Sequence, residues 1–101
     1  MLPFERLKKM NTKDNLWLYI LFLLNEKSVY GWEIPKLVKE KFGFLPGKIT
    51  PYRVLYRLEK DGFVESQLIE RKRIYKITEK GKEELNKAKE FFENILQWFP
   101  K

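Results

Sequence analysis

The order of apolar and polar positions predicts helices in the first part of the chain and strands after them. Residues 16–24 form its longest apolar run and contain only aliphatic and aromatic side chains. Asn11 or Thr12 is a candidate N-cap ahead of this run, and the helix is expected to reach about Glu26. Because it is apolar on all sides, the helix should be buried on more than one side and should need two packing partners.

A second helix is expected after a short break in the pattern. Residues 27–30 form the link, and Gly31 opens a helix that reaches Phe42. Gly43 is its stop signal, because glycine readily adopts the left-handed conformation that ends a helix.

The third helix begins with the combination Thr50-Pro51, typical of an N-cap hydroxyl followed by proline at the first helical position. The helix is expected to run to about Lys60. A helical projection places the apolar side chains of this helix on one face. Its basic side chains and Tyr56 fall on the opposite face. The two sets are Pro51, Val54, Leu55 and Leu58 against Arg53, Tyr56, Arg57 and Lys60.

Alternation then replaces helical spacing. Residues 63–69 and 73–78 predict two strands joined as a hairpin, with charged residues at the tip, 70–73. Thr78 is the expected N-cap of a last long helix that ends near Pro100.

Three helices, a hairpin and a helix give the order of a winged helix-turn-helix, a mainly α chain with a small β-hairpin (α+β). At 101 residues the chain is one domain. Its parts are an N-terminal arm (1–11), the winged-helix region (12–78) and a C-terminal dimerisation helix (79–101). The N-terminal arm has apolar residues three apart at Phe4, Leu7 and Met10, a spacing that fits either a short amphipathic arm or a loosely packed lead-in.

Composition excludes most catalytic chemistry. The chain has no Cys and no His, which removes disulfides, the usual zinc ligands, thiol nucleophiles and imidazole catalysis. No paired-carboxylate or Ser-base arrangement is visible either, so we expect neither an enzyme nor a bound cofactor or metal. The longest apolar run is far short of the ~20 residues that span a bilayer, and a cytoplasmic protein without a membrane partner is expected.

The net charge of +7 is concentrated in two segments. Residues 36–60 carry +5 and residues 67–82 carry +4, whereas residues 83–101 sum to −1. A basic third helix and a basic hairpin fit the phosphate backbone of nucleic acid, where much of the affinity comes from displaced counterions. The alternative is a solvated basic surface, since charged hairpin tips also discourage edge pairing.

Double-stranded DNA is therefore the expected partner, with residues 48–60 in the major groove and residues 68–73 on the backbone or in the minor groove. Arg53 is the first candidate for a base contact, because its planar fork can bond guanine O6 and N7 together. Tyr52 and Tyr56 have a simpler interpretation as a half-buried flank residue and a surface aromatic. The complete candidate set is Lys48, Thr50, Tyr52, Arg53, Tyr56, Arg57, Lys60, Arg71, Lys72 and Arg73.

The last helix carries an apolar stripe with the 3, 4, 3, 4 spacing of a coiled-coil seam. Such a stripe is too large to leave in water, so a two-fold homodimer through the first and last helices is expected. Packing of the stripe on the chain's own first helix is the alternative. The candidate interface residues are Leu16, Leu18, Tyr19, Phe22, Leu85, Ala88, Phe91, Phe92, Ile95, Trp98 and Phe99.

Several short motifs follow one another in an informative order. They are Gly31-Trp32-Glu33-Ile34; then Thr50, Tyr52, Leu55, Arg57, Leu58 and Glu59; then Gly62-Phe63-Val64; then Arg73-Ile74-Tyr75-Lys76-Ile77-Thr78 with Gly81. From Tyr30 to Gly81 the sequence resembles the PadR family of transcriptional regulators. Two departures are that Ile49 and Pro51 flank Thr50, where the family often has Gly and Leu, and that one helix replaces a longer C-terminal region.

The resemblance implies a winged helix that dimerises through terminal helices, binds an operator and represses transcription, in some members under control of a small aromatic ligand. Trp17, Trp98, Phe91 and Phe99 are the aromatic residues that could serve such an effector, with simple core packing as the alternative. Two other functions stay open: a non-specific architectural DNA-binding protein, and a winged-helix protein-interaction module.

Overall fold

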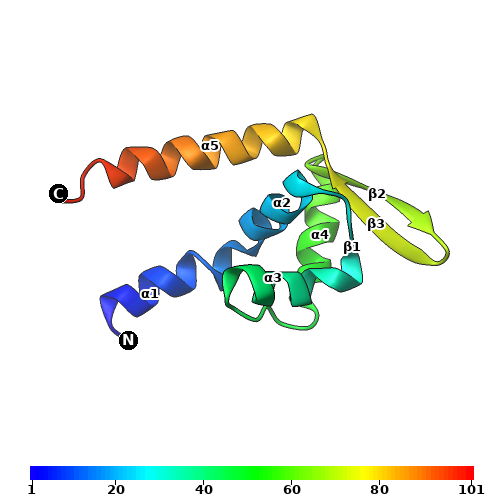
Figure 1. Cartoon of the computed structure of the whole chain (residues 1–101), viewed down its shortest axis with the longest axis horizontal. Helices are drawn as coiled ribbons and strands as arrows, with labels where there is room; N and C mark the ends of the chain where they lie inside the picture. Colours follow the sequence, from blue (N-terminus) through cyan, green and yellow to red (C-terminus); the bar gives the residue numbers. More distant parts are fainter.

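The computed structural model covers residues 1–101 and contains five α-helices, two short 3-10 helices and one three-stranded sheet (Figure 1). The predicted order of helices, hairpin and last helix is confirmed. The elements are α1 (Pro3–Met10), η1 (Lys13–Asn15), α2 (Leu16–Glu26), β1 (Val29–Tyr30), η2 (Gly31–Glu33), α3 (Ile34–Phe42), α4 (Thr50–Lys60), β2 (Val64–Ile69), β3 (Lys72–Ile77) and α5 (Glu79–Leu96).

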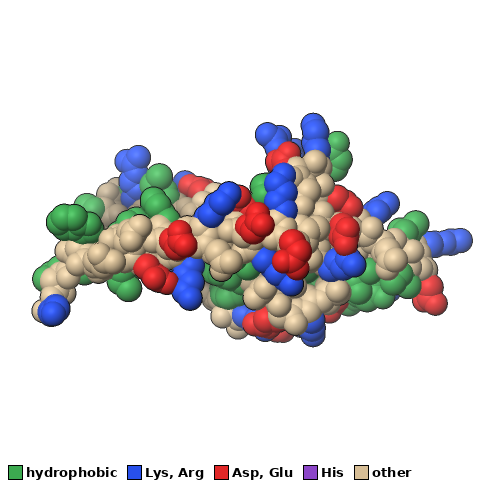
Figure 2. Space-filling model, turned by 90° about the horizontal axis from the view of Figure 1, so that it is seen from above, with side chains coloured by type: hydrophobic (Ala, Val, Ile, Leu, Met, Phe, Trp, Pro, Cys, Tyr) green, Lys and Arg blue, Asp and Glu red, His purple; other side chains and the backbone are tan.

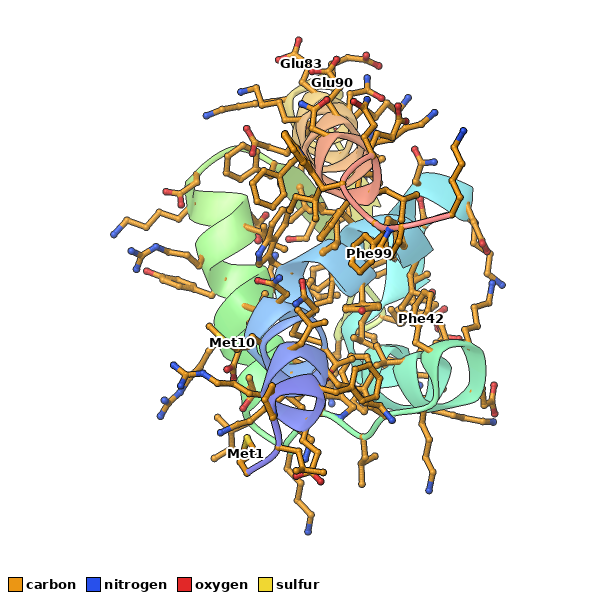
Figure 3. All side chains as sticks on the ribbon, turned by 90° about the vertical axis from the view of Figure 1, so that its left-hand side faces the viewer. Met1, Met10, Phe42, Glu83, Glu90 and Phe99 are labelled. Carbon is orange, nitrogen blue, oxygen red and sulfur yellow. The ribbon has the colours of Figure 1, made fainter.

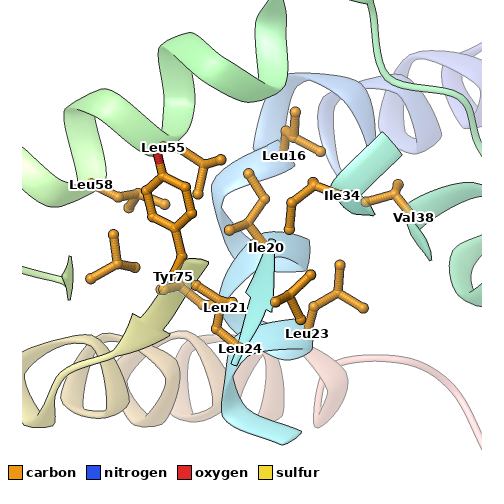
Figure 4. Close-up of a cluster of buried hydrophobic side chains, with 12 residues drawn as sticks. Leu16, Ile20, Leu21, Leu23, Leu24, Ile34, Val38, Leu55, Leu58 and Tyr75 are labelled. Atoms are coloured by element: carbon orange, nitrogen blue, oxygen red, sulfur yellow. The ribbon is translucent and has the colours of Figure 1, made fainter. Parts of the chain in front are cut away.

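The apolar helix α2 lies at the centre and packs against α3, α4, α5 and β3. Its Ile20 and Leu21 have no exposed surface, and they meet Ile34 of α3 and Leu55 of α4 in the core (Figure 4). Burying each such side chain contributes about 1.5–3 kcal/mol. The expectation that this helix needs more than one partner is confirmed, and four elements of its own chain supply them.

Two of the predicted helix caps are wrong. Thr12 Oγ1 donates to Lys8 O at 2.7 Å and Asn11 Nδ2 donates to Leu7 O at 2.8 Å. Both side chains therefore satisfy carbonyls at the end of α1, and α2 starts later, after the turn η1. Thr50 also fails as an N-cap, because it is already the first residue of α4 and no side chain caps that helix.

Two other predicted helix signals are confirmed. Gly43 ends α3 in the left-handed region, with φ at +79°. The hydroxyl of Thr78 accepts the Gly81 N–H at 3.1 Å and donates to Gly62 O at 2.7 Å. This cap ties the start of α5 to the chain that precedes β2.

The sheet has a third strand that the sequence pattern did not predict. The presumed link contains β1, which pairs antiparallel with β3 through Val29↔Tyr75 and Tyr30↔Ile74, giving the order β1-β3-β2. Two residues are too few to show alternation, and they form a strand because β3 presents unpaired backbone groups along that edge.

The wing is the β2–β3 hairpin, and its tip is tighter than predicted. Only Glu70 and Arg71 lie outside the strands, and both have positive φ, at 49° and 68°. This is the backbone signature of a type I′ turn, whose twist matches that of the strands. Lys72 and Arg73, which we expected at the tip, belong to β3.

Two helical arms leave the body on the same side, away from the wing (Figure 1). The predicted N-terminal arm is the helix α1, none of whose residues is buried. The other arm is α5, which ends at Leu96 rather than near Pro100. The arms make the molecule elongated, with extents of 51 × 29 × 21 Å. No helix combines the length and the apolar character that crossing a membrane requires.

Candidate nucleic-acid interface

Helix α4 separates its apolar and basic sides as the projection predicted. Pro51, Leu55 and Leu58 are buried against the body. The opposite face is open to solvent, with Tyr56 68% exposed. The exposed candidates on and before this helix are Lys48, Thr50, Tyr52, Arg53, Tyr56, Arg57 and Lys60.

The two arginines of α4 differ in their surroundings. Arg57 Nε lies 3.6 Å from Asp61 Oδ2, one helical turn later, in an exposed ion pair that contributes little to stability. Arg53 lies in the first half of the helix and has no ion-pair partner within the chain. Its guanidinium is therefore free to bind a partner molecule.

A hydrogen-bond chain that the sequence analysis missed joins α4 to the wing. The Glu59 carboxylate accepts the Ser66 N–H at 3.0 Å and the Ser66 hydroxyl at 2.7 Å. Arg73 in turn donates to Ser66 Oγ at 3.0 Å. The one acidic side chain of α4 thus fixes β2 against the helix and orients a wing arginine. The sequence did offer one signal for this contact, because Glu59 is the only carboxylate in an otherwise basic helix.

Tyr75 of β3 packs at the same junction between α4 and the wing. Its side chain is buried and points toward α4 (Figure 4). Burial raises the pKa of the Tyr75 phenol above its usual value, and the nearby charge of Glu59 raises it further. The Tyr75 ring also lies 3.1 Å from the position that a Cβ on Gly31 would occupy, so a side chain there would require the ring to shift by a few tenths of an ångström.

Trp32 is a second feature that the analysis of the sequence did not single out for this surface. It follows Gly31, is 56% exposed and stacks on Tyr30 with ring centroids 6.5 Å apart. Lys72 Nζ, from the wing, lies 5.6 Å from the centroid of the Trp32 ring. Periodicity assigned this residue only to the first turn of a helix, because nothing in the sequence indicates that the wing returns to it.

The wing places its basic side chains along one exposed ribbon. Arg71 at the tip and Lys72 next to it are exposed, as is Arg73. The structure thus brings the wing candidates and the α4 candidates to adjoining elements, joined by the Glu59–Ser66 bonds.

A groove of about 510 Å³ lies between α2, α4 and α5. Trp17, Leu21 and Val54 line its apolar part, and Arg53 and Arg57 lie at its edge. Of the four aromatic residues that we considered for an effector, only Trp17 reaches this groove. Trp98, Phe91 and Phe99 belong to the exposed end of the α5 arm.

The interface candidates on α2 are mostly committed within the chain. Leu16 and Leu18 are buried, and only Phe22 counts as exposed. Tyr19 packs edge-on against Phe42, its hydroxyl donates to Asn11 O, and burial raises its pKa.

The interface candidates on α5 divide along its length. Leu85 and Ala88 are partly buried near the body. Figure 2 shows acidic and basic side chains alternating along the outer side of this helix, and Figure 3 shows Glu83 and Glu90 pointing away from the body. Beyond them the apolar residues are exposed, although Phe91 and Phe92 pack edge-on against each other. The exposed set is Phe91, Phe92, Ile95, Leu96, Trp98 and Phe99, with Trp98 at 89%.

Comparison with known proteins identifies relatives of this architecture. The profile of the family described as "Transcriptional regulator PadR-like family" matches residues 20–87. A transcriptional regulator from Clostridium thermocellum is 31% identical, with a TM-score of 0.74 over 84% of this chain and 92% of that chain. A comparison with curated proteins gives no match.

Two structures of Bacillus subtilis PadR are also similar, each over 72% of this chain but less than half of the longer protein. The complex with operator DNA is 30% identical, with a TM-score of 0.66, and 46% of that chain is covered. The complex with p-coumaric acid is 31% identical, with a TM-score of 0.60, and 40% of that chain is covered.

Proposed function

The chain belongs to the PadR-like family of transcriptional regulators, and from this premise we propose that it represses transcription in the cytoplasm by binding a specific DNA sequence as a homodimer. The observation that carries the proposal is the exposed basic face of α4, opposite its buried face and next to a basic wing. Residues 48–60 enter the major groove, and residues 68–73 lie on the backbone or in the minor groove.

Within this surface, Arg53 is proposed to read a base. It is exposed, lies on the outward face of α4 and has no ion-pair partner, so its planar fork can engage guanine without breaking an existing contact. Arg57 is proposed to exchange its exposed pairing with Asp61 for a phosphate. The other phosphate contacts are assigned to Lys48, Thr50, Tyr52, Tyr56 and Lys60.

On the wing, Arg71 and Lys72 are proposed to contact the DNA backbone directly. Arg73 differs, because one of its nitrogens already donates to Ser66. It is proposed to hold the wing against α4 while its remaining N–H groups face the DNA.

The experiment compares two duplexes, the DNA upstream of the protein's own gene and a shuffled sequence of equal length, at the same salt concentration. Arg53→Ala should weaken binding to the specific duplex about five- to hundredfold, the range for one bidentate base contact, with little effect on the shuffled duplex. Lys60→Ala is the matched control, and it should weaken binding to both duplexes alike.

Two outcomes would contradict this proposal. Equal affinity of the wild type for both duplexes would favour the non-specific architectural protein. Normal DNA binding after neutralisation of Arg53, Arg57 and the wing arginines would favour the protein-interaction module, because the basic face would then serve another partner.

The homodimer is supported by the uncovered apolar residues of the two arms. The exposed end of α5 includes Phe92 and Ile95, and α1 adds Phe4 and Leu7 on the same side of the molecule. Apolar patches of this kind in a soluble chain mark interfaces. A two-fold pairing of the arms would present two α4 helices to two half-sites.

Control by a small aromatic ligand is a second element of the proposal. The groove beside Trp17 is lined half by hydrophobic residues and half by polar ones, which include Asp14 and Glu84 as well as two arginines. Its apolar part suits a planar ring, and the arginines could pair with a carboxylate on that ring. A titration of tryptophan fluorescence with p-coumaric acid, the compound in the B. subtilis PadR complex, should show a saturable change that Trp17→Leu removes. A change that persists in this variant would place the ligand elsewhere.

A further inference from the structure

The outer half of the wing has few connections to the rest of the molecule. On one side β3 is paired with β1 only through Tyr75 and Ile74, because β1 ends at Tyr30. Beyond Ile74, toward the tip, the wing is a two-stranded ribbon, and such a ribbon alone is marginally stable in water. A contact with the helical body at this level would therefore fix where the wing points.

Trp32 provides that contact. The chain leaves β1 at Tyr30 and turns through η2, which carries the indole to the level of Lys72 on β3. The Lys72 ammonium lies 5.6 Å from the ring centroid, within the range of cation–π attraction. The Trp32 ring also stacks on the Tyr30 ring, with an interplanar angle of 25°.

The same turn also touches α4. Gly31 lies against Tyr52 of the first turn of α4, with 3.7 Å between the position of a Cβ on Gly31 and the Tyr52 ring. Neighbouring residues thus lead from Tyr52 through Gly31 and Trp32 to Lys72. They connect the helix proposed to read bases with the strand proposed to contact the backbone.

Trp32 is poorly explained as a core residue. It is 56% exposed and does not belong to the buried cluster. Its exposed indole instead lies against Lys72, between two elements of the basic surface. The position of Trp32 is therefore better explained by the role of Lys72 in binding.

We propose that Trp32 is a positioning residue for DNA binding, which holds the Lys72 ammonium against the η2 turn, itself next to the first turn of α4, so that the wing meets the DNA backbone at a fixed distance from the recognition helix. This inference rests on the proposed function. It assigns to Trp32 a role that depends on Lys72.

A double-mutant cycle tests that dependence. The variants are Trp32→Leu, Lys72→Met and the two combined, and binding to the specific duplex is measured by fluorescence anisotropy at several salt concentrations. Lys72→Met should reduce the salt slope by about 0.9, the value for one phosphate contact. Trp32→Leu should weaken binding about two- to fivefold, the range for an exposed cation–π contact, and Trp32→Phe should recover most of this loss. In the Lys72→Met background, Trp32→Leu should change the affinity little.

Lys76→Met is the matched control. Lys76 lies on the same strand and faces the same side, but its ammonium pairs with Glu65 at 3.0 Å instead of an aromatic ring. Combined with Trp32→Leu, its effect should be additive. The free protein offers a second measurement: the ε-methylene protons of Lys72 should resonate upfield of those of the other lysines, and Trp32→Leu should abolish this ring-current shift.

The outcomes separate the inference from the proposed function. If the wild type binds no duplex, the proposed function and the inference with it are overturned. If the wild type binds and Arg53→Ala weakens it, but the Trp32 and Lys72 effects are additive or the ring-current shift is absent, only the inference fails. Coupling in the Lys72 cycle and none in the Lys76 cycle would support it.

Discussion

Replacement of Gly81 by alanine should destabilise the protein, although helix propensity predicts the opposite. Gly81 lies in the first turn of α5, and an alanine in a helix is normally about 1 kcal/mol more favourable than a glycine. In the structure, a Cβ at this position would lie 2.2 Å from Phe63 O and 2.7 Å from Ile77 Cγ1. Both distances are far shorter than any van der Waals contact, and one of the atoms belongs to the backbone.

The magnitude follows from what must move. Phe63 O accepts the Thr78 N–H at 3.1 Å, and the Thr78 hydroxyl caps α5, so the helix cannot shift without weakening this junction. Overpacking of a tight site costs about 1–3 kcal/mol, and a weakened backbone hydrogen bond costs about 1 kcal/mol more. After the gain in propensity is subtracted, Gly81→Ala should lose about 1–3 kcal/mol, which lowers the Tm of a domain of this size by roughly 4–8 °C for each kcal/mol.

Thermal unfolding followed by circular dichroism measures this loss, at one fixed protein concentration because the stability of the proposed dimer would depend on concentration. Asn86→Ala is the control, since Asn86 is exposed in the same helix and should show the ordinary gain of a few tenths of a kcal/mol. A Gly81→Ala variant at least as stable as the wild type would refute the reasoning, because the helix would then sit far enough from Phe63 to accept a methyl group.

Two further predictions concern the wing junction and the arms. Glu59→Gln should weaken the bonds to Ser66 by about 1 kcal/mol and lower the pKa of Tyr75, because the charge that raises it is removed. A raised pKa in the folded state means that the stability it contributes is fully present below pH 10.0, the ordinary value, and is lost as the pH rises through the folded-state pKa, so this alkaline loss should be smaller in the variant, whose folded-state pKa lies closer to the ordinary value. Ultraviolet titration of the phenols and unfolding between pH 8 and 12 check both statements; an unchanged Tyr75 titration would contradict them. Phe92→Glu should shift the protein toward monomer in sedimentation experiments and weaken binding to a two-half-site duplex far more than to a single half-site, whereas an unchanged sedimentation coefficient would exclude the α5 interface.

Much of the candidate nucleic-acid interface could be predicted from the sequence, because α4 is an amphipathic helix with a regular period. Its buried and exposed sides depend on local spacing alone, and Leu55 and Tyr56 fall where the projection places them. The cap at Thr78 was predictable for the same reason, since the hydroxyl and the Gly81 N–H that it accepts are three residues apart.

The features that the sequence did not predict depend on contacts between distant segments. β1 forms a strand because Tyr75 and Ile74, more than forty residues later, offer an edge. Glu59 meets Ser66 only because the chain reverses at Gly62, and Trp32 meets Lys72 only through the wing. Single-sequence periodicity carries no information on such pairings.

Gly81 is a further case in which the sequence alone gives the wrong expectation for stability. As a residue within a helix it indicates a small loss of stability, whereas its actual role is to allow a backbone carbonyl to approach closely.

The tip of the wing contains residues that its turn type does not favour. A type I′ turn favours Asn-Gly, because both central residues have positive φ, yet this chain places Glu70 and Arg71 there. Each non-glycine residue in such a conformation costs about 1 kcal/mol or more. Two charged side chains of opposite sign therefore stand at the tip in spite of the backbone strain, at the end of the wing that lies away from the body. In a comparison of relatives, the residues at the tip should therefore vary more than Gly62 and Gly81, which lie at the junction of α4, the wing and α5.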